Sequence, residues 1–197
     1  GDYAEINLIS GLLGSDERQY DFGFKPTLSV GNQVWTDANN NGLFDTHESG
    51  LDGVEVLLIN LGPDGQKGTT DDIEIANTTT QNGGQYLFSD LVEGDYFVKL
   101  NSGIPAGYMS ATGAGLDFAN AANYEPGNNT DADNDDNGSQ MGSMIMSAAF
   151  NLEYCKEPTN EDNDNNTNLT IDFGLTKCSS LGDYVWLDKN TDGIQED

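Results

Sequence analysis

A twelve-residue stretch limits the folds open to this chain more than any other feature. It reads Asp37-Ala38-Asn39-Asn40-Asn41-Gly42-Leu43-Phe44-Asp45-Thr46-His47-Glu48. Oxygen-bearing side chains fall at loop positions 1, 3, 5, 9 and 12 with glycine at position 6, which is the EF-hand calcium pattern. Calcium takes about six to eight oxygen ligands, so alternate residues must turn oxygens inward while the glycine makes the sharp bend. We therefore expect a calcium site, with Glu48 bidentate and the Leu43 carbonyl as one ligand, made by Asp37, Asn39, Asn41, Leu43, Asp45 and Glu48.

The competing interpretation of this stretch is a surface turn, because Asn, Asp and Gly dominate turns for reasons unrelated to metal. Agreement at six positions together favours calcium. The flanks are not helical. Residues 29–36 place Val30, Val34 and Trp35 in a β-type run, residues 49–53 are typical of a turn, and residues 54–59 predict a strand. The loop therefore joins two strands.

The charge balance narrows the function classes. The chain carries 34 Asp and Glu against 7 Lys and Arg, a formal net charge of −27. Nucleic acids and anionic lipid surfaces both require a basic protein surface, so we expect neither as a partner. Crowded carboxylates repel one another in the compact state, and bound calcium would relieve that repulsion.

Composition also predicts an ordered, extracellular segment. Eight Tyr, eight Phe and two Trp argue against disorder. No stretch approaches the roughly 18 consecutive apolar residues of a membrane helix, so we expect a soluble excerpt of a longer protein. EF-type sites of extracellular modules bind calcium with dissociation constants of about 10⁻⁴ to 10⁻³ M, and the free calcium concentration of the cytosol is too low to fill such sites. We therefore expect an extracellular location, at the cell surface.

Two sequence features recur at one spacing. Residues 29–37 (SVGNQVWTD) return as residues 180–188 (SLGDYVWLD), and the triplet Asp-Phe-Gly occurs at 21–23 and 172–174; both pairs are 151 residues apart. We interpret residues 1–28 as the tail of one repeat plus a linker, 29–175 as a complete repeat, and 176–197 as a linker and the head of the next. The head begins a second calcium loop, whose expected ligands are Asp188, Asn190, Asp192 and Ile194.

Inside the complete repeat, turn residues separate short alternating runs. Strands are expected at 54–60, 73–80, 85–88 and 94–100, with a loop at 61–72 and a hairpin turn at 81–84. Period-two patterning with regular turns predicts an all-β sandwich. Residues 101–147 show little alternation, so we expect no regular secondary structure there.

These motifs together resemble the SdrD B-like domain, a calcium-binding relative of the CnaB-type repeats of bacterial surface adhesins. The resemblance rests on the opening Val34-Trp35-Thr36-Asp37, the spacing of Gly83, Tyr86, Phe88, Leu91, Gly94 and Tyr96, and the closing Asp172-Phe173-Gly174. It implies an Ig-like or prealbumin-like (CnaB-type) sandwich in tandem repeats, several Ca²⁺ per repeat, and service as a stalk between the cell surface and an adhesive tip. It also implies two further metal-binding segments, the 61–72 loop with Asp64, Asp71 and Asp72, and the acidic insertion with Asp131, Asp133, Asp135 and Asp136.

The same resemblance raises the question of an isopeptide cross-link. Related CnaB domains join a Lys of the first strand to an Asn or Asp of the last, but residues 29–36 contain no Lys, and Lys99 falls on a different strand. We expect calcium to supply the rigidity. Cys155 and Cys178 are open to two interpretations, a disulfide in an oxidising compartment or two unpaired thiols.

Three function classes compete. The first is a calcium-stiffened structural repeat of an adhesin or surface filament, with adjacent repeats, and like chains in a fibre, as partners. The second is a module that binds carbohydrate or a host protein through the 101–147 insertion. The third, an enzyme, is disfavoured because the single histidine, His47, falls within the calcium loop and no nucleophile pattern accompanies it.

Overall fold

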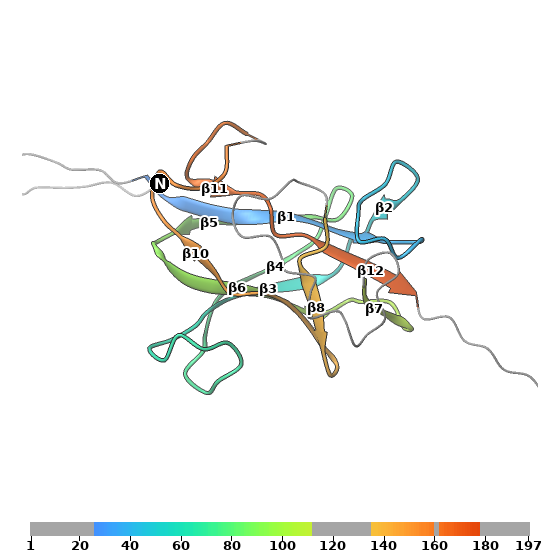
Figure 1. Cartoon of the computed structure of the whole chain (residues 1–197), viewed down its shortest axis with the longest axis horizontal. Helices are drawn as coiled ribbons and strands as arrows, with labels where there is room; N and C mark the ends of the chain where they lie inside the picture. The colour runs from blue at the N-terminus through green and yellow to red at the C-terminus, as the bar shows by residue number, and fades with distance from the viewer. Residues whose placement is uncertain (1–25, 112–134, 160–161, 178–197) are drawn as a thin grey trace, which may run out of the picture.

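The computed structural model describes residues 26–111, 135–159 and 162–177, and these form strands joined by loops and turns (Figure 1). No described segment is a helix that could span a membrane. The strands are β1 (Leu28–Thr36), β2 (Ser49–Gly50), β3 (Glu55–Asn60), β4 (Ile73–Thr79), β5 (Gln85–Leu91), β6 (Gly94–Ser102), β7 (Tyr108–Ser110), β8 (Gly138–Met141), β9 (Met144–Ser147), β10 (Phe150–Leu152), β11 (Thr167–Asn168) and β12 (Phe173–Lys177).

The strands form two sheets, with β1 and β11 on one side of the molecule and β3 and β6 on the other (Figure 1). The first sheet runs β11-β1-β12-β7, and β2 and β5 also pair with β1. The second runs β4-β3-β6-β9-β8, with β10 also paired to β6. The predicted all-β sandwich is therefore confirmed.

The core lies between the sheets and follows the alternation seen in the sequence. In β1 the side chains of Val30 and Val34 are fully buried, and in β6 Tyr96, Val98 and Leu100 face the same interior. Full burial of a Val or Leu side chain contributes about 1.5–3 kcal/mol. Hydrophobic burial across both inner faces therefore holds the sheets together.

A second apolar cluster lies apart from the main core. It comprises Leu57, Ile59, Leu61, Phe97 and Met146, all nearly buried. Leu57 and Ile59 alternate with the core residues of β3, so they lie on the opposite face of the second sheet. The 61–72 loop supplies Leu61, and the Nζ of its Lys67 donates to the Ser147 carbonyl at 2.6 Å. The loop is thus tied to the end of β9 beside this cluster.

The expectation that residues 101–147 lack regular structure is wrong at both ends of that stretch. β7 pairs with β12, and β8 and β9 form a hairpin whose second strand pairs with β6. These strands are short and include Ser and Gly, so main-chain pairing specifies them more than apolar alternation does. Residues 112–134 lie outside the described part of the chain.

Candidate metal centre

The Asp37 loop begins where β1 ends, and Asp37 anchors it. The Asp37 amide donates to the Leu175 carbonyl of β12 at 2.9 Å, and its side chain is only 1% exposed. One carboxylate oxygen accepts from the Gly42 amide at 2.7 Å and the other from the Asn41 amide at 3.2 Å. Gly42 has a φ of 74°, a conformation that glycine adopts at no steric cost. The predicted sharp bend thus lies at the predicted glycine.

The odd positions after Asp37 continue this curl. The side-chain oxygen of Asn39 accepts from the Asn41 amide at 3.0 Å, and that of Asn41 accepts from the Leu43 amide at 2.8 Å. Each such contact turns the backbone back toward the preceding side chain. Oxygens of alternate residues are therefore gathered along one loop, as the spacing predicted.

Asp45 and Glu48 close the loop. Asp45 Oδ2 accepts from the side-chain amides of Asn39 and Asn41 at 2.9 and 3.0 Å. Glu48 accepts from the Ala38 amide through Oε1 at 2.8 Å and from the Asp45 amide through Oε2 at 3.1 Å. The carboxylate of Glu48 therefore spans the two ends of the loop, where a bidentate ligand is required.

The end of the acidic insertion lies against this loop. The Asp136 amide donates to the Gly42 carbonyl at 2.8 Å, and Asp135 forms an isolated bridge with Leu43. The next residue, Asn137, donates its amide to the Asp172 carbonyl at 2.9 Å, and its side-chain oxygen accepts from the Asp172 amide at 2.6 Å. Three segments far apart in sequence, 37–48, 135–138 and 172–175, thus meet at one place.

Asp136 is the most perturbed carboxylate of this junction. Its side chain is fully buried; Oδ1 accepts from the Gly138 and Gly174 amides at 2.8 and 3.0 Å, while Oδ2 is buried with no hydrogen-bond partner among the described residues. Burial raises the pKa of Asp136 well above its usual value, the two amides oppose that rise, and the charges of Asp37 and Asp135 add to it. A buried carboxylate beside two others is stabilised by a cation. This oxygen therefore fits a divalent ion.

The sequence interpretation used the Asp172-Phe173-Gly174 triplet as a repeat marker and as a family motif, and its residues also build this junction. Asp172 accepts from the Gln33 amide at 2.9 Å and from the Asn32 side chain at 3.1 Å. A Cβ on Gly174 would lie 2.9 Å from the Trp35 ring. The triplet therefore fixes β12 against β1 and the insertion.

The 61–72 loop gathers the other predicted acidic residues. Asp71 accepts from the Thr69 hydroxyl at 2.6 Å and the Asp64 amide at 3.1 Å, contacts that lower its pKa in that order. Asp72 Oδ2 accepts from the Gly68 and Thr69 amides at 2.7 and 3.1 Å, and its Oδ1 is buried without a hydrogen-bond partner among the described residues. The structure therefore brings Asp64, Asp71 and Asp72 into one loop.

Among the described residues, no three His, Cys, Asp or Glu side chains form a ready-made metal cluster, so Asn and carbonyl oxygens would have to complete any ligand set. His47 and Cys155 are exposed. Six predicted site residues lie outside the described part of the chain: Asp131, Asp133, Asp188, Asn190, Asp192 and Ile194. Cys178 and the triplet at 21–23 also lie outside it.

Comparison with known proteins identifies a family that matches most of the chain. The model of the SdrD B-like domain matches residues 28–175. Serine-aspartate repeat-containing protein D of Staphylococcus aureus (strain MW2) is 34% identical over 188 residues, which are 94% of this chain and 11% of that protein. The bone sialoprotein-binding protein of S. aureus (strain MRSA252) is 33% identical over 189 residues, 94% of this chain and 13% of that protein. The chain thus spans about an eighth of the length of these relatives.

Solved structures of pilins also align. The shaft pilin SpaA of Lactobacillus rhamnosus GG aligns over 79% of this chain and 52% of its own, with 10% identity and a TM-score of 0.38. The major pilin SpaD of Corynebacterium diphtheriae aligns over 80% of this chain and 33% of its own, with 15% identity and a TM-score of 0.38.

Proposed function

The chain belongs to the SdrD B-like domain family, and from that membership we propose that it is a calcium-stiffened structural repeat that holds an adhesive tip away from the bacterium. Relatives that match 94% of the chain are staphylococcal Sdr surface proteins. The chain is accordingly extracellular and lies at the cell surface, as the sequence analysis predicted.

The observation that carries the calcium proposal is the meeting of three segments around the partnerless oxygen of Asp136. Each of those segments carries a buried acidic residue, Asp37, Asp136 or Asp172, and the charges of Asp37 and Asp135 disfavour the ionised form of Asp136. Bound calcium supplies positive charge that offsets this repulsion. The residues that would hold it in the Asp37 loop are Asp37, Asn39, Asn41, Asp45 and Glu48, with the carbonyl of Leu43.

We assign a second ion to the junction beside that loop. Asp136 would offer Oδ2, and Asp135 lies next to it in the bridge to Leu43. An ion shared by the two segments would restrict how they move relative to each other, in addition to the Asp136–Gly42 hydrogen bond and the Asp135–Leu43 bridge that already join them. Asp131 and Asp133 precede them in sequence and are further candidates.

A third ion is proposed for the 61–72 loop, through Asp64, Asp71 and Asp72. That loop is tied to β9 by Lys67 and supplies Leu61 to the outer apolar cluster. Ordering the loop would therefore stiffen the outer face of the second sheet. Several Ca²⁺ per repeat would then order the Asp37 loop, the junction at Asp136 and the 61–72 loop.

The stalk role also depends on neighbours. Between Phe24 and Ser29 lie four residues, Lys25, Pro26, Thr27 and Leu28, which span at most about 14 Å when extended. Adjacent repeats of the same chain would therefore nearly touch, and they are the proposed partners, together with like chains in a fibre. Neither nucleic acid nor a membrane is proposed as a partner, and no catalytic role is proposed for a family of structural and adhesin domains.

Small-angle X-ray scattering of a tandem-repeat protein tests this proposal. In millimolar calcium we expect a stiff rod, and in excess EDTA a shorter mean dimension with greater flexibility. An Asp37→Ala version of every repeat should behave in calcium as the unchanged protein does in chelator. Identical scattering profiles in calcium and chelator would reject the stalk mechanism, even if single sites bind metal.

A further inference from the structure

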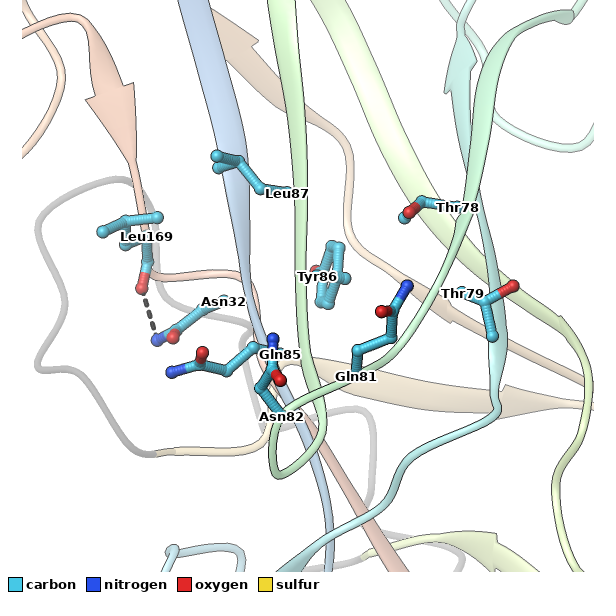
Figure 2. Close-up of a pocket in the computed structure, with 9 residues that line it drawn as sticks. All are labelled: Asn32, Thr78, Thr79, Gln81, Asn82, Gln85, Tyr86, Leu87 and Leu169. Atoms are coloured by element: carbon cyan, nitrogen blue, oxygen red, sulfur yellow. Dashed lines mark hydrogen bonds between the residues drawn. The ribbon is translucent and has the colours of Figure 1, made fainter.

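A cavity of about 460 Å³ lies between the end of β4, the 81–84 turn and the start of β5, and none of the proposed metal ligands lines it (Figure 2). Its lining is uncharged: Asn32, Thr78, Thr79, Gln81, Asn82, Gln85, Tyr86, Leu87 and Leu169. We call this the amide groove. The chain has 34 acidic residues among 197, so the amide groove differs from the rest of the protein in having no charged side chain in its lining.

The polar side chains of the groove have unused hydrogen-bonding capacity. Within the described residues, no intramolecular hydrogen bond uses the side chains of Thr78, Thr79, Gln81, Asn82 or Gln85. Each amide offers two donor hydrogens and an acceptor oxygen, and each hydroxyl offers one donor and accepts as well. By contrast, the Tyr86 hydroxyl donates to the Ile171 carbonyl and the Asn32 amide to the Leu169 carbonyl. Five groups thus remain available to a ligand.

The backbone that carries these side chains is held firmly. Gln81 and Gln85 exchange two main-chain hydrogen bonds, at 2.9 and 2.8 Å. Asp52 Oδ1 accepts from the Gly83 and Gly84 amides at 2.9 and 2.7 Å, and a Cβ on Gly84 would lie 2.0 Å from the Val34 carbonyl oxygen. A fixed backbone lowers the conformational entropy lost on binding.

The chemistry of the groove selects a class of ligand. Anionic ligands find no cation here and meet the repulsion of a protein with net charge −27. Extended peptides gain specificity from pockets for apolar anchor residues. Apart from the buried Tyr86, the apolar residues of this lining are Leu87 and Leu169, so a peptide would find few such anchor points here. Sugar hydroxyls donate and accept as amides do, and Leu87, 53% exposed, offers a surface for the carbon-bound hydrogens of a sugar ring. The volume falls within the range of about 300–1,000 Å³ typical of small-molecule sites.

We propose that the amide groove binds neutral, uncharged glycans, so that this domain contacts carbohydrate in addition to its structural role. The inference does not depend on calcium at any of the loops above. The groove is formed by different residues, and its ligand would be recognised by side-chain amides and hydroxyls.

The test uses the whole chain in millimolar calcium on an array of neutral oligosaccharides of hexose and N-acetylhexosamine. The array also carries sialylated and sulfated forms of the same oligosaccharides and a set of unstructured peptides. Titration calorimetry with the strongest neutral oligosaccharide then gives its affinity. We expect neutral oligosaccharides to be retained above their charged forms and above the peptides.

Variants link that binding to the groove. Gln81→Ala with Gln85→Ala should lower the affinity about tenfold or more, because both side-chain amides that would hydrogen-bond the sugar hydroxyls are removed. Asn77→Ala, on β4 but outside the lining, should leave the affinity unchanged. Thermal denaturation of both variants shows whether they fold like the parent, and Thr79→Ala replaces the double variant if that one does not. Absence of neutral-glycan binding, preference for charged glycans or peptides, or equal affinities of parent and groove variants would overturn the proposal.

Discussion

The Asp136 amide donates to the carbonyl of Gly42 at 2.8 Å, so a residue of the acidic insertion contacts the turn glycine of a loop almost a hundred positions earlier. This contact places the buried carboxylate of Asp136 beside Asp37, and the charge of Asp37 adds to the rise in its pKa. A buried carboxylate without enough positive charge around it lowers the stability of the junction, and the proposed ion would offset that same loss.

Asp136→Asn separates the two effects. The amide oxygen keeps the contacts with the Gly138 and Gly174 amides, while the buried negative charge is removed. We expect the variant to match or exceed the parent's melting temperature in EDTA and to fall below it in calcium. Asp90→Asn, at an exposed position, should change neither value. An equal loss of stability in both conditions would contradict the assignment of Asp136 to an ion.

Lys67→Met tests whether the 61–72 loop is tied to the second sheet. Methionine keeps the apolar stem but loses the hydrogen bond to the Ser147 carbonyl, at a cost of about 1 kcal/mol in the free energy of unfolding. Urea denaturation measures this cost, and limited proteolysis should cut within 61–72 faster. The control is Lys177→Met at an exposed site. Unchanged stability together with unchanged cleavage would show that the contact does not hold the loop.

Glu157→Gln tests a buried acid far from the metal loops. Burial raises the pKa of Glu157 above its usual value of 4.5, while the Glu153 amide and the Asn168 side chain lower it. The folded state therefore holds this proton more tightly than the unfolded state. The resulting stabilisation is complete below the unfolded pKa and is lost as pH rises through the folded pKa.

Relative to the Gln variant, the parent should thus gain unfolding free energy as the pH falls from 7 toward 4. Denaturant titrations at several pH values measure that difference. Glu74→Gln, at an exposed position of β4, should show no such trend. A difference between parent and Glu157→Gln that is constant with pH would refute the burial effect.

The sequence predicted the sandwich because its core strands alternate. It predicted the bend of the Asp37 loop because Gly42 and the oxygen-bearing side chains of alternate residues specify that turn. It did not predict the burial of Phe97, which lies on the outer face of β6 and is covered from outside the strand. A period-two pattern identifies only one buried face of a strand. The outer face of β6 is buried partly by Leu61 of the 61–72 loop, and the pattern within β6 does not reveal that contact.

The junction of Asp136 with Asp37 was also beyond the sequence interpretation. The acidic residues of the insertion were identified as ligand candidates, but their contact with Gly42 depends on how the chain returns through β8 and β9. The same holds for Asp172, whose contacts with Asn32 and Gln33 connect residues about 140 positions apart. A single sequence carries no pairing information at that distance.

Calorimetric melting of the chain in millimolar calcium and in excess EDTA tests the central claim most directly. An ion present at a hundredfold excess over its dissociation constant stabilises the folded state by about 2.7 kcal/mol, and several sites would add to that. The account predicts a melting temperature that is clearly higher in calcium, falls in EDTA and is restored when calcium is returned. Equal melting temperatures in calcium and in EDTA would contradict it.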